Sequence, residues 1–193
     1  MLHSFKDTLI DLECALNDQA GFNSSFFETL GFCFNLETLD VSGSNDINDD
    51  GGRALTNASI TVGNETVKPG LTACHTLKIS GSNIGDATLP LITKAMPNLE
   101  HVELVKCEAI SEFGINCILQ NCEKIIFLDI AKVPIFDYNF LDELRQTNPT
   151  LYIRRNKHQG DDFKKDNGLR VPRRIISKKK KKKKKKGKGK KKR

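Results

Sequence analysis

Six cysteines and four histidines are the side chains of this chain most able to hold a metal ion or attack a substrate. Their spacing suits neither metal binding nor nucleophilic catalysis, because no Cys-x-x-Cys pair occurs and the close pair Cys117 and Cys122 is separated by four residues. Neither a glycine-rich phosphate loop nor a nucleophile elbow is present. We therefore expect no enzyme, no cofactor and no metal centre, although the carboxylates Asp49 and Asp50 leave a weak cation site open.

The elements that would position any site come from a pattern that repeats along the chain. The spacing apolar-x-x-apolar-x-apolar occurs four times, and its middle apolar residues lie 38, 25 and 26 residues apart. A weaker copy precedes these four at Ile10-Asp-Leu12, and a shortened copy follows them at Leu151-Tyr-Ile153. Alternating apolar residues predict a short strand in each copy. The four full copies are Leu36-Glu-Thr-Leu39-Asp-Val41, Cys74-His-Thr-Leu77-Lys-Ile79, Leu99-Glu-His-Val102-Glu-Leu104 and Ile125-Ile-Phe-Leu128-Asp-Ile130.

A second pattern follows each predicted strand and indicates a helix. Five or six residues after the third apolar position comes Ile-x-acid, as in Ile47-Asn-Asp49 and Ile84-Gly-Asp86, with further copies at Ile110 and Ile135. We expect the isoleucine to enter the core and the acid either to cap the first N–H groups of a helix or to complement its positive end. Apolar residues at helical spacing follow. The longer first interval, residues 56–70, is rich in Gly, Asn and Thr and is interpreted as an insertion loop.

One copy resembles a known repeat. The residues Cys33-Phe-Asn-Leu36-Glu-Thr-Leu39-Asp-Val41, followed by Ile47-Asn-Asp49-Asp-Gly51, are similar to the cysteine-containing leucine-rich repeat of F-box/leucine-rich-repeat proteins and related ribonuclease-inhibitor-like proteins. The likeness covers residues 33–153. It implies an α/β fold, a leucine-rich-repeat solenoid shaped as a short right-handed horseshoe with parallel strands inside and helices outside. Cys33 and Cys122 fill the leading cysteine position of the repeat, so we expect buried thiols.

The resemblance implies a non-enzymatic recognition subunit, often the substrate-recognition component of an SCF-type ubiquitin ligase that docks through an N-terminal F-box. The Leu-Pro opening and the Cys/Trp-bearing helix of an F-box are missing from residues 1–34. We interpret residues 1–32 as an N-terminal cap or a degenerate first repeat. A ligase role would then require a longer chain or a second protein that acts in trans.

Residues between the inward apolar positions would line the concave side of such a sheet. The predicted central column is mostly acidic and begins at Asp11, and it favours a basic protein partner. A solvated face without a ligand is the alternative. His101 and Phe127 are predicted neighbours that form a small hydrophobic anchor. The predicted partner-binding residues are Asp40, Lys78, His101, Glu103, Phe127, Asp129 and Tyr152.

Charge is divided unevenly along the chain. Residues 178–193 carry 14 of the 31 basic side chains, whereas residues 1–153 carry nine basic against 21 acidic side chains. We expect a polar linker over residues 154–177 and a disordered poly-lysine tail over residues 178–193, because a run of like charges cannot be buried or paired. The targeting or phosphate-binding residues of this basic segment are Arg173, Arg174, Lys178, Lys179, Lys180 and Lys181.

Two function classes therefore compete. The first is a protein-interaction scaffold that the basic tail directs to the nucleus or nucleolus, with the cytoplasm as the alternative location. The second is a nucleic-acid- or ribosome-associated factor that binds RNA or DNA phosphates through the poly-lysine tail, with steep salt dependence and no sequence preference. Docking of the tail on the acidic face is a further, intramolecular alternative. The sequence has no apolar run of membrane-spanning length, and we expect no membrane partner and a monomer.

Overall fold

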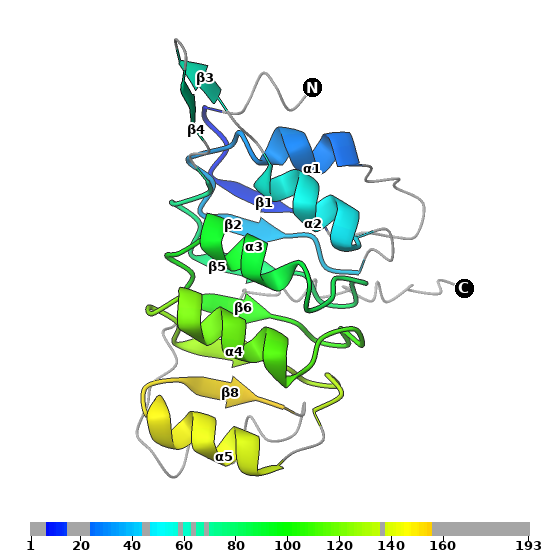
Figure 1. Cartoon of the computed structure of the whole chain (residues 1–193), viewed down its shortest axis with the longest axis vertical. Coiled ribbons are helices and arrows are strands. Elements are labelled where there is room, and N and C mark those ends of the chain that lie inside the picture. Colours follow the sequence, from blue (N-terminus) through cyan, green and yellow to red (C-terminus); the bar gives the residue numbers. More distant parts are fainter. Residues whose placement is uncertain are drawn as a thin grey trace, which may run out of the picture. The chain divides into compact units, whose positions relative to one another are not determined.

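The computed structural model describes residues 7–14, 24–43, 47–57, 60–62, 65–67, 70–135 and 138–155. Strands and helices alternate along this part of the chain (Figure 1). The strands are β1 (Asp11–Glu13), β2 (Thr38–Asp40), β3 (Ile60–Val62), β4 (Glu65–Val67), β5 (Thr76–Lys78), β6 (His101–Glu103), β7 (Phe127–Asp129) and β8 (Tyr152–Arg154). The helices are α1 (Ser24–Leu30), α2 (Asp49–Thr56), α3 (Leu89–Ala95), α4 (Glu112–Asn121) and α5 (Tyr138–Thr147). The predicted tail and its targeting residues lie outside the described residues.

Six of these short strands form one parallel sheet in the order β1-β2-β5-β6-β7-β8. The strands pair in register, so that Leu39 of β2 lies beside Leu77 of β5. The ladder continues past the strand ends, where the amide of Val41 donates to the carbonyl of Lys78 at 2.9 Å. The predicted parallel stacking of the repeats is therefore confirmed.

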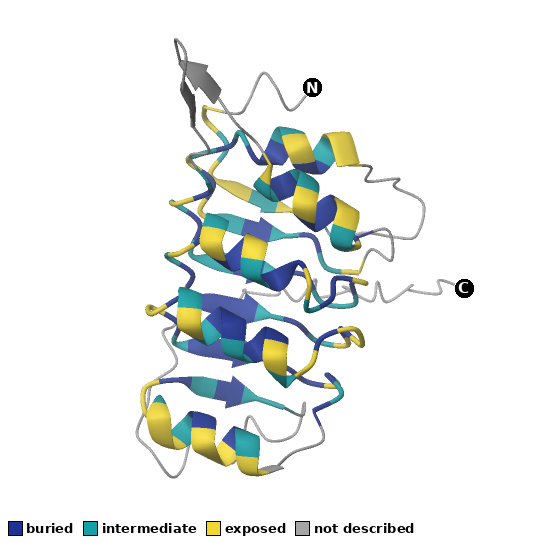
Figure 2. Ribbon diagram, in the orientation of Figure 1, coloured by how far each residue is buried: buried dark blue, intermediate teal, exposed yellow. Residues whose placement is uncertain are grey.

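The described helices lie on one side of this sheet, and each has a buried and an exposed side (Figures 1 and 2). The core lies between the helices and the sheet. It contains the middle residue of β2, β5, β6, β7 and β8, because the middle side chain of a strand points opposite to its two neighbours. These middle residues, all at most 7% exposed, are Leu39, Leu77, Val102, Leu128 and Ile153.

Two acids of the Ile-x-acid pattern, Asp49 and Asp86, join neighbouring repeats instead of capping their own helices. The carboxylate of Asp49 accepts the amide of Gly85 at 2.9 Å and the hydroxyl of Thr88 at 2.5 Å. Asp86 accepts the amide of Ser111 at 2.9 Å in the same way. The predicted capping of the first N–H groups is therefore wrong for both acids, because each reaches donors on the next repeat. Asp49 does lie in the first turn of α2, where a carboxylate complements the positive end of the helix as predicted. The helix caps are the side chains one residue before α2 and α4, namely Asn48 and Ser111.

The two end repeats have a different register from the predicted one. Leu12 and Ile153 pair with the middle apolar residues of β2 and β7, although the sequence pattern placed them at the third apolar position. The position two residues after Ile153 is Arg155, whose guanidinium donates to the carbonyl of Ile135 at 3.0 Å. An arginine therefore stands where the preceding repeats bury an aliphatic side chain.

Within residues 56–70, interpreted from the sequence as an insertion loop, the structure describes two short strands. The strands β3 and β4 pair antiparallel, with Ile60 opposite Val67. β-branched residues favour strands, and the two-residue spacing Gly63-Asn64 is typical of a hairpin. This hairpin is a two-stranded sheet separate from the main one.

All six cysteines are free thiols, and five of them are buried. Burial raises the pKa of Cys74 to about 12 and that of Cys122 to about 11, although hydrogen bonds to the backbone oppose the change. Such thiols stay protonated at neutral pH and are poor nucleophiles. The prediction that the cysteines Cys33 and Cys122 are buried core residues is confirmed.

Candidate partner-binding face

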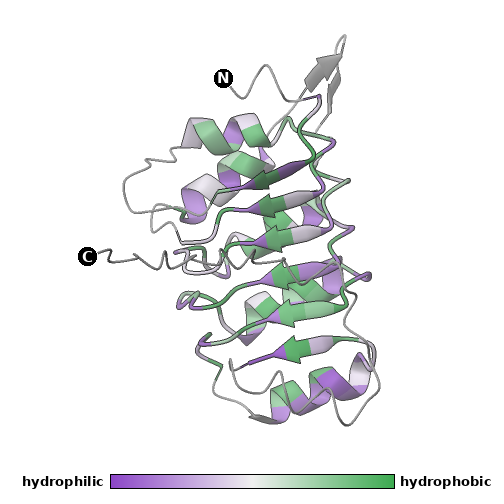
Figure 3. Cartoon of the chain, turned by 180° about the vertical axis from the view of Figure 1, so that it is seen from behind, coloured by the Kyte–Doolittle hydropathy of each residue, from purple (hydrophilic) through white to green (hydrophobic). Residues whose placement is uncertain are grey.

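The side of the six-stranded sheet turned away from the helices, here called the helix-free face, is at the front in Figure 3. Each strand contributes its first and third residues to this face, because side chains alternate along a strand. The first-position column is Asp11, Thr38, Thr76, His101, Phe127 and Tyr152. The third-position column is Glu13, Asp40, Lys78, Glu103, Asp129 and Arg154.

The structure changes both ends of the predicted central column. Glu13 takes the place predicted for Asp11, and Arg154 takes the place predicted for Tyr152. The arginine adds a second cation to the third-position column, and the tyrosine joins the first-position column instead. At the β8 end, the third-position column is therefore less acidic and the first-position column more aromatic than the sequence suggested.

Ion pairs link neighbouring strands within the third-position column. The Nζ of Lys78 lies 3.5 Å from Oδ2 of Asp40. Arg154 donates to Oδ2 of Asp129 through Nε at 2.7 Å and through Nη2. Asp129 is fully buried and also accepts the amide of Ala131 at 3.1 Å. These carboxylates are therefore already neutralised by cations of the chain itself.

Glu103 is paired with a histidine of its own strand. Nε2 of His101 lies 2.9 Å from Oε1 of Glu103. Burial alone would raise the pKa of Glu103, but the hydrogen bond from His101 and the charges of Lys78 and Arg154 outweigh it, so the pKa is lowered. Since Nε2 donates to the carboxylate, a neutral His101 leaves Nδ1 as an acceptor, and this buried atom has no hydrogen-bond partner in the described part of the chain.

Three rings stack in the first-position column and form what we call the aromatic row. The rings of His101 and Phe127 are parallel within 2°, with centroids 4.2 Å apart. Tyr152 follows, with its centroid 5.4 Å from that of Phe127. The guanidinium carbon of Arg154 lies 5.6 Å from the Phe127 centroid, within the range of a cation–π contact. The row therefore adds side-chain contacts between β6, β7 and β8 to the backbone hydrogen bonds that already pair these strands.

The predicted partner-binding residues differ in exposure. Three of them are buried and hold the face together, with exposed fractions of 4%, 6% and 0% for His101, Phe127 and Asp129. The others are half-buried, and these are Asp40, Lys78, Glu103 and Tyr152. Arg154, which was not among the predicted partner-binding residues, belongs with the second group because its side chain is 36% exposed. Placing Ile153 at the middle apolar position, as the structure does, would have put Arg154 in the same column as Asp129.

Other kinds of site are not found in the described part of the chain. No group of three or more His, Cys, Asp or Glu side chains is placed there to hold a metal ion. Among the described helices, none has the length and apolar character needed to span a membrane. The helix-free face is therefore the surface that sequence and structure together nominate.

Comparison with known proteins agrees with this architecture. A family model for the leucine rich repeat matches residues 32–55, the segment that contains β2 and all but the last residue of α2. No curated protein matches the chain. The match, the alternating elements and the parallel sheet support a leucine-rich-repeat protein with an α/β repeat fold. Leucine-rich repeats are typically non-catalytic modules that bind protein partners.

Proposed function

We propose that the repeat domain is a non-enzymatic scaffold that binds a protein partner across its helix-free face. The observation that supports this is a surface whose side chains are already fixed by their own contacts. The ion pair of Lys78 and Asp40 and the aromatic row immobilise groups that would otherwise lose entropy on binding. Pre-organisation of this kind leaves more of the contact energy for affinity.

The accessible groups of this face suit a partner of mixed charge. Tyr152 and Arg154 are of the residue types that most often dominate binding energy at interfaces. Asp40 and Glu103 offer carboxylates, but each has a cationic or imidazole neighbour. We propose that a basic part of the partner contacts the β1–β2 end of the face, where Asp11 and Glu13 are exposed.

Co-purification of the full chain with matched variants tests this proposal. We expect Lys78→Glu combined with Tyr152→Ala to lose the partners that the unmodified chain retains. The control is Lys94→Glu, which makes the same charge change on the exposed side of α3. Circular dichroism establishes that each variant is folded. If both variants keep the same partners, the helix-free face is not the binding surface.

The basic segment motivates a second proposal, which is the alternative function class. Residues 178–193 carry 14 positive charges, which supports targeting to the nucleus or binding to nucleic-acid phosphates. A fluorescent fusion ending at Ser177 should lose nuclear enrichment. RNA binding by the full chain should fall steeply with salt, and binding that persists at high salt would contradict a tail-based mechanism. The role in a ubiquitin ligase is a proposal carried by the family resemblance, and co-purified ligase subunits would support it.

A further inference from the structure

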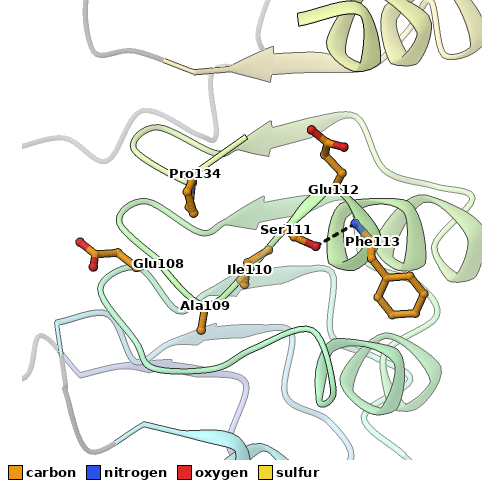
Figure 4. Close-up of a pocket in the computed structure, with 7 residues that line it drawn as sticks. All are labelled: Glu108, Ala109, Ile110, Ser111, Glu112, Phe113 and Pro134. Carbon is orange, nitrogen blue, oxygen red and sulfur yellow. Dashed lines mark hydrogen bonds between the residues drawn. The ribbon is translucent and has the colours of Figure 1, made fainter. Parts of the chain in front are cut away.

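A hollow of about 850 Å³ lies at the edge of the repeats, away from the two columns of the helix-free face. Figure 4 shows that it lies between the connection from β6 to α4 and the connection from β7 to α5. The first connection contributes Glu108, Ala109 and the start of α4, and the second contributes Pro134. The hollow is open to solvent and is not an enclosed cavity.

The floor of this hollow is held by a chain of hydrogen bonds. Asp86 accepts the amide of Ser111 at 2.9 Å, and the Ser111 hydroxyl accepts the amide of Phe113 at 3.2 Å. Gly114 leaves room for this arrangement, because a Cβ there would lie 2.4 Å from the Asp86 carboxylate. The backbone that presents Phe113 is therefore fixed by the neighbouring repeat.

Phe113 is the most exposed large apolar side chain of the described residues, at 61%. The position that follows the acid of the Ile-x-acid pattern is Asp50 in the first repeat and Ala87 in the second. A polar or small residue is therefore compatible with the fold at this place, and folding does not require an aromatic ring there. A single exposed apolar side chain is ordinary on a protein surface, so the significance of Phe113 comes from its place in the lining of the hollow beside other apolar and acidic groups.

Two carboxylates accompany the exposed ring. Glu108 and Glu112 line the hollow, and no cationic side chain of the described residues lines it. Lys106 and Lys132 are exposed on the turns just before it but are not lining residues. Recognition at this hollow would therefore depend on direct contacts with the carboxylates and the aromatic ring, which lie on the same concave surface.

We propose that this hollow binds a protein segment that carries an aliphatic or aromatic side chain next to Lys or Arg. The apolar side chain packs on Phe113 and Pro134, and the cations lie against Glu108 and Glu112. This surface is distinct from the helix-free face, so the proposal extends the proposed function and does not depend on it. Charge complementarity identifies the occupant, because an acidic or purely polar segment would leave the carboxylates or the ring without a matching group.

Fluorescence polarisation with short labelled peptides and the full chain tests the proposal. The probe peptide has a central Leu flanked by Lys on both sides, and its two controls replace the Leu by Ala or the Lys by Glu. We expect the probe to bind at least about fivefold more tightly than either control, the loss typical of removing an interface anchor. Every protein variant keeps residues 156–193, so any competition from the basic tail is the same in each.

Matched variants locate the binding. Phe113→Ala and Glu108→Lys should each weaken probe binding at least about fivefold. The controls Leu91→Ala and Glu100→Lys remove another exposed apolar side chain and reverse another exposed acid, and they should leave the affinity unchanged. Amide chemical shifts should change at residues 108–113 and at Val133 and Ile135, which flank Pro134, when the probe is added.

The proposal would be overturned if the probe did not bind, if the three peptides bound with equal affinity, or if the variants and their controls lost equal amounts of affinity. Chemical-shift changes confined to strand residues of the helix-free face would also overturn it. That last result would still support the proposed function, so failure of one proposal is distinguishable from failure of the other.

Discussion

The two halves of the helix-free face are built on the same backbone and differ in their side chains. Strands β1, β2 and β5 present small or half-buried polar groups such as Thr38, Asp40 and Thr76. Strands β6, β7 and β8 present the aromatic row and the buried ion pair of Asp129 and Arg154. The first half is a solvated surface, and the second half is a packed layer in its own right.

Asp40 and Asp129 show what causes this difference. Both are the third residue of their strand, and both accept the amide two residues later at 3.1 Å. The Asp40 side chain is 23% exposed, whereas that of Asp129 is fully buried beside Arg154. The same local geometry therefore contributes differently to stability at the two positions. Larger neighbours on the adjacent strands exclude water from the carboxylate of Asp129 and not from that of Asp40.

Replacing these two carboxylates should give the largest contrast. We expect Asp129→Ala to lower the free energy of unfolding by about 3 kcal/mol, because it leaves Arg154 and the amide of Ala131 without their buried acceptor. The matched change Asp40→Ala should cost about 1 kcal/mol or less, since water can replace the lost contacts. Urea denaturation monitored by circular dichroism measures both. Equal losses would mean that the two halves do not differ in packing.

The aromatic row should give the next largest effect. Phe127→Ala removes the central ring, and we expect the free energy of unfolding to fall by about 2–3 kcal/mol. This loss is below the usual range for a core phenylalanine, because the ring packs on the helix-free face and not in the main core. The matched change Thr76→Ala lies in the same column on β5 and should change stability by about 0.5 kcal/mol or less. A loss for Phe127→Ala as small as that for Thr76→Ala would show that the row is not a packed layer.

The turns after the strands also differ between the two halves, and here substitution is expected to raise stability instead of lowering it. At this position β2 and β5 are followed by Gly43 and Gly81, whereas β6 and β7 are followed by Lys106 and Lys132, with φ of 64° and 66°. A lysine in this left-handed region is strained, which glycine avoids at the expense of a more flexible unfolded chain. We expect Lys106→Gly and Lys132→Gly each to raise the free energy of unfolding by about 0.5–1 kcal/mol. The melting temperature of each variant should rise accordingly. Differential scanning calorimetry measures the change, and no increase would indicate that the turns relieve the strain elsewhere.

Acid titration should show the smallest effect. The pKa of Glu103 is lowered in the folded chain, so its ionised form contributes stability that is present above the unfolded pKa of about 4.3 and is lost as the pH falls through the folded pKa. Glu103→Gln should therefore make stability less dependent on pH below about 4.3 and leave its dependence at higher pH unchanged. Urea midpoints measured at several acidic pH values test this. Identical pH profiles for the variant and the unmodified chain would argue against the lowered pKa.

The sequence alone predicted those features of the fold that every repeat must share. Inward aliphatics such as Leu39 and Leu77 recur once per repeat because every strand must bury the same position, and this periodicity predicted the parallel sheet. The buried cysteines followed from the same alignment. The ends of the array were harder to predict, because a terminal repeat has only one neighbour and so tolerates Arg155 where the others need an aliphatic residue.

The side-chain partners were decided by the tertiary structure. The capping role predicted for Asp49 and Asp86 was wrong because a linear pattern shows which residue begins a helix but not which donors the next repeat brings to it. The acidic column lost much of its charge when the true register placed Arg154 beside Asp129. Repeat periodicity is a local property that the sequence records directly, whereas pairing and burial depend on which residues the stacking brings into contact, and only the folded chain determines that.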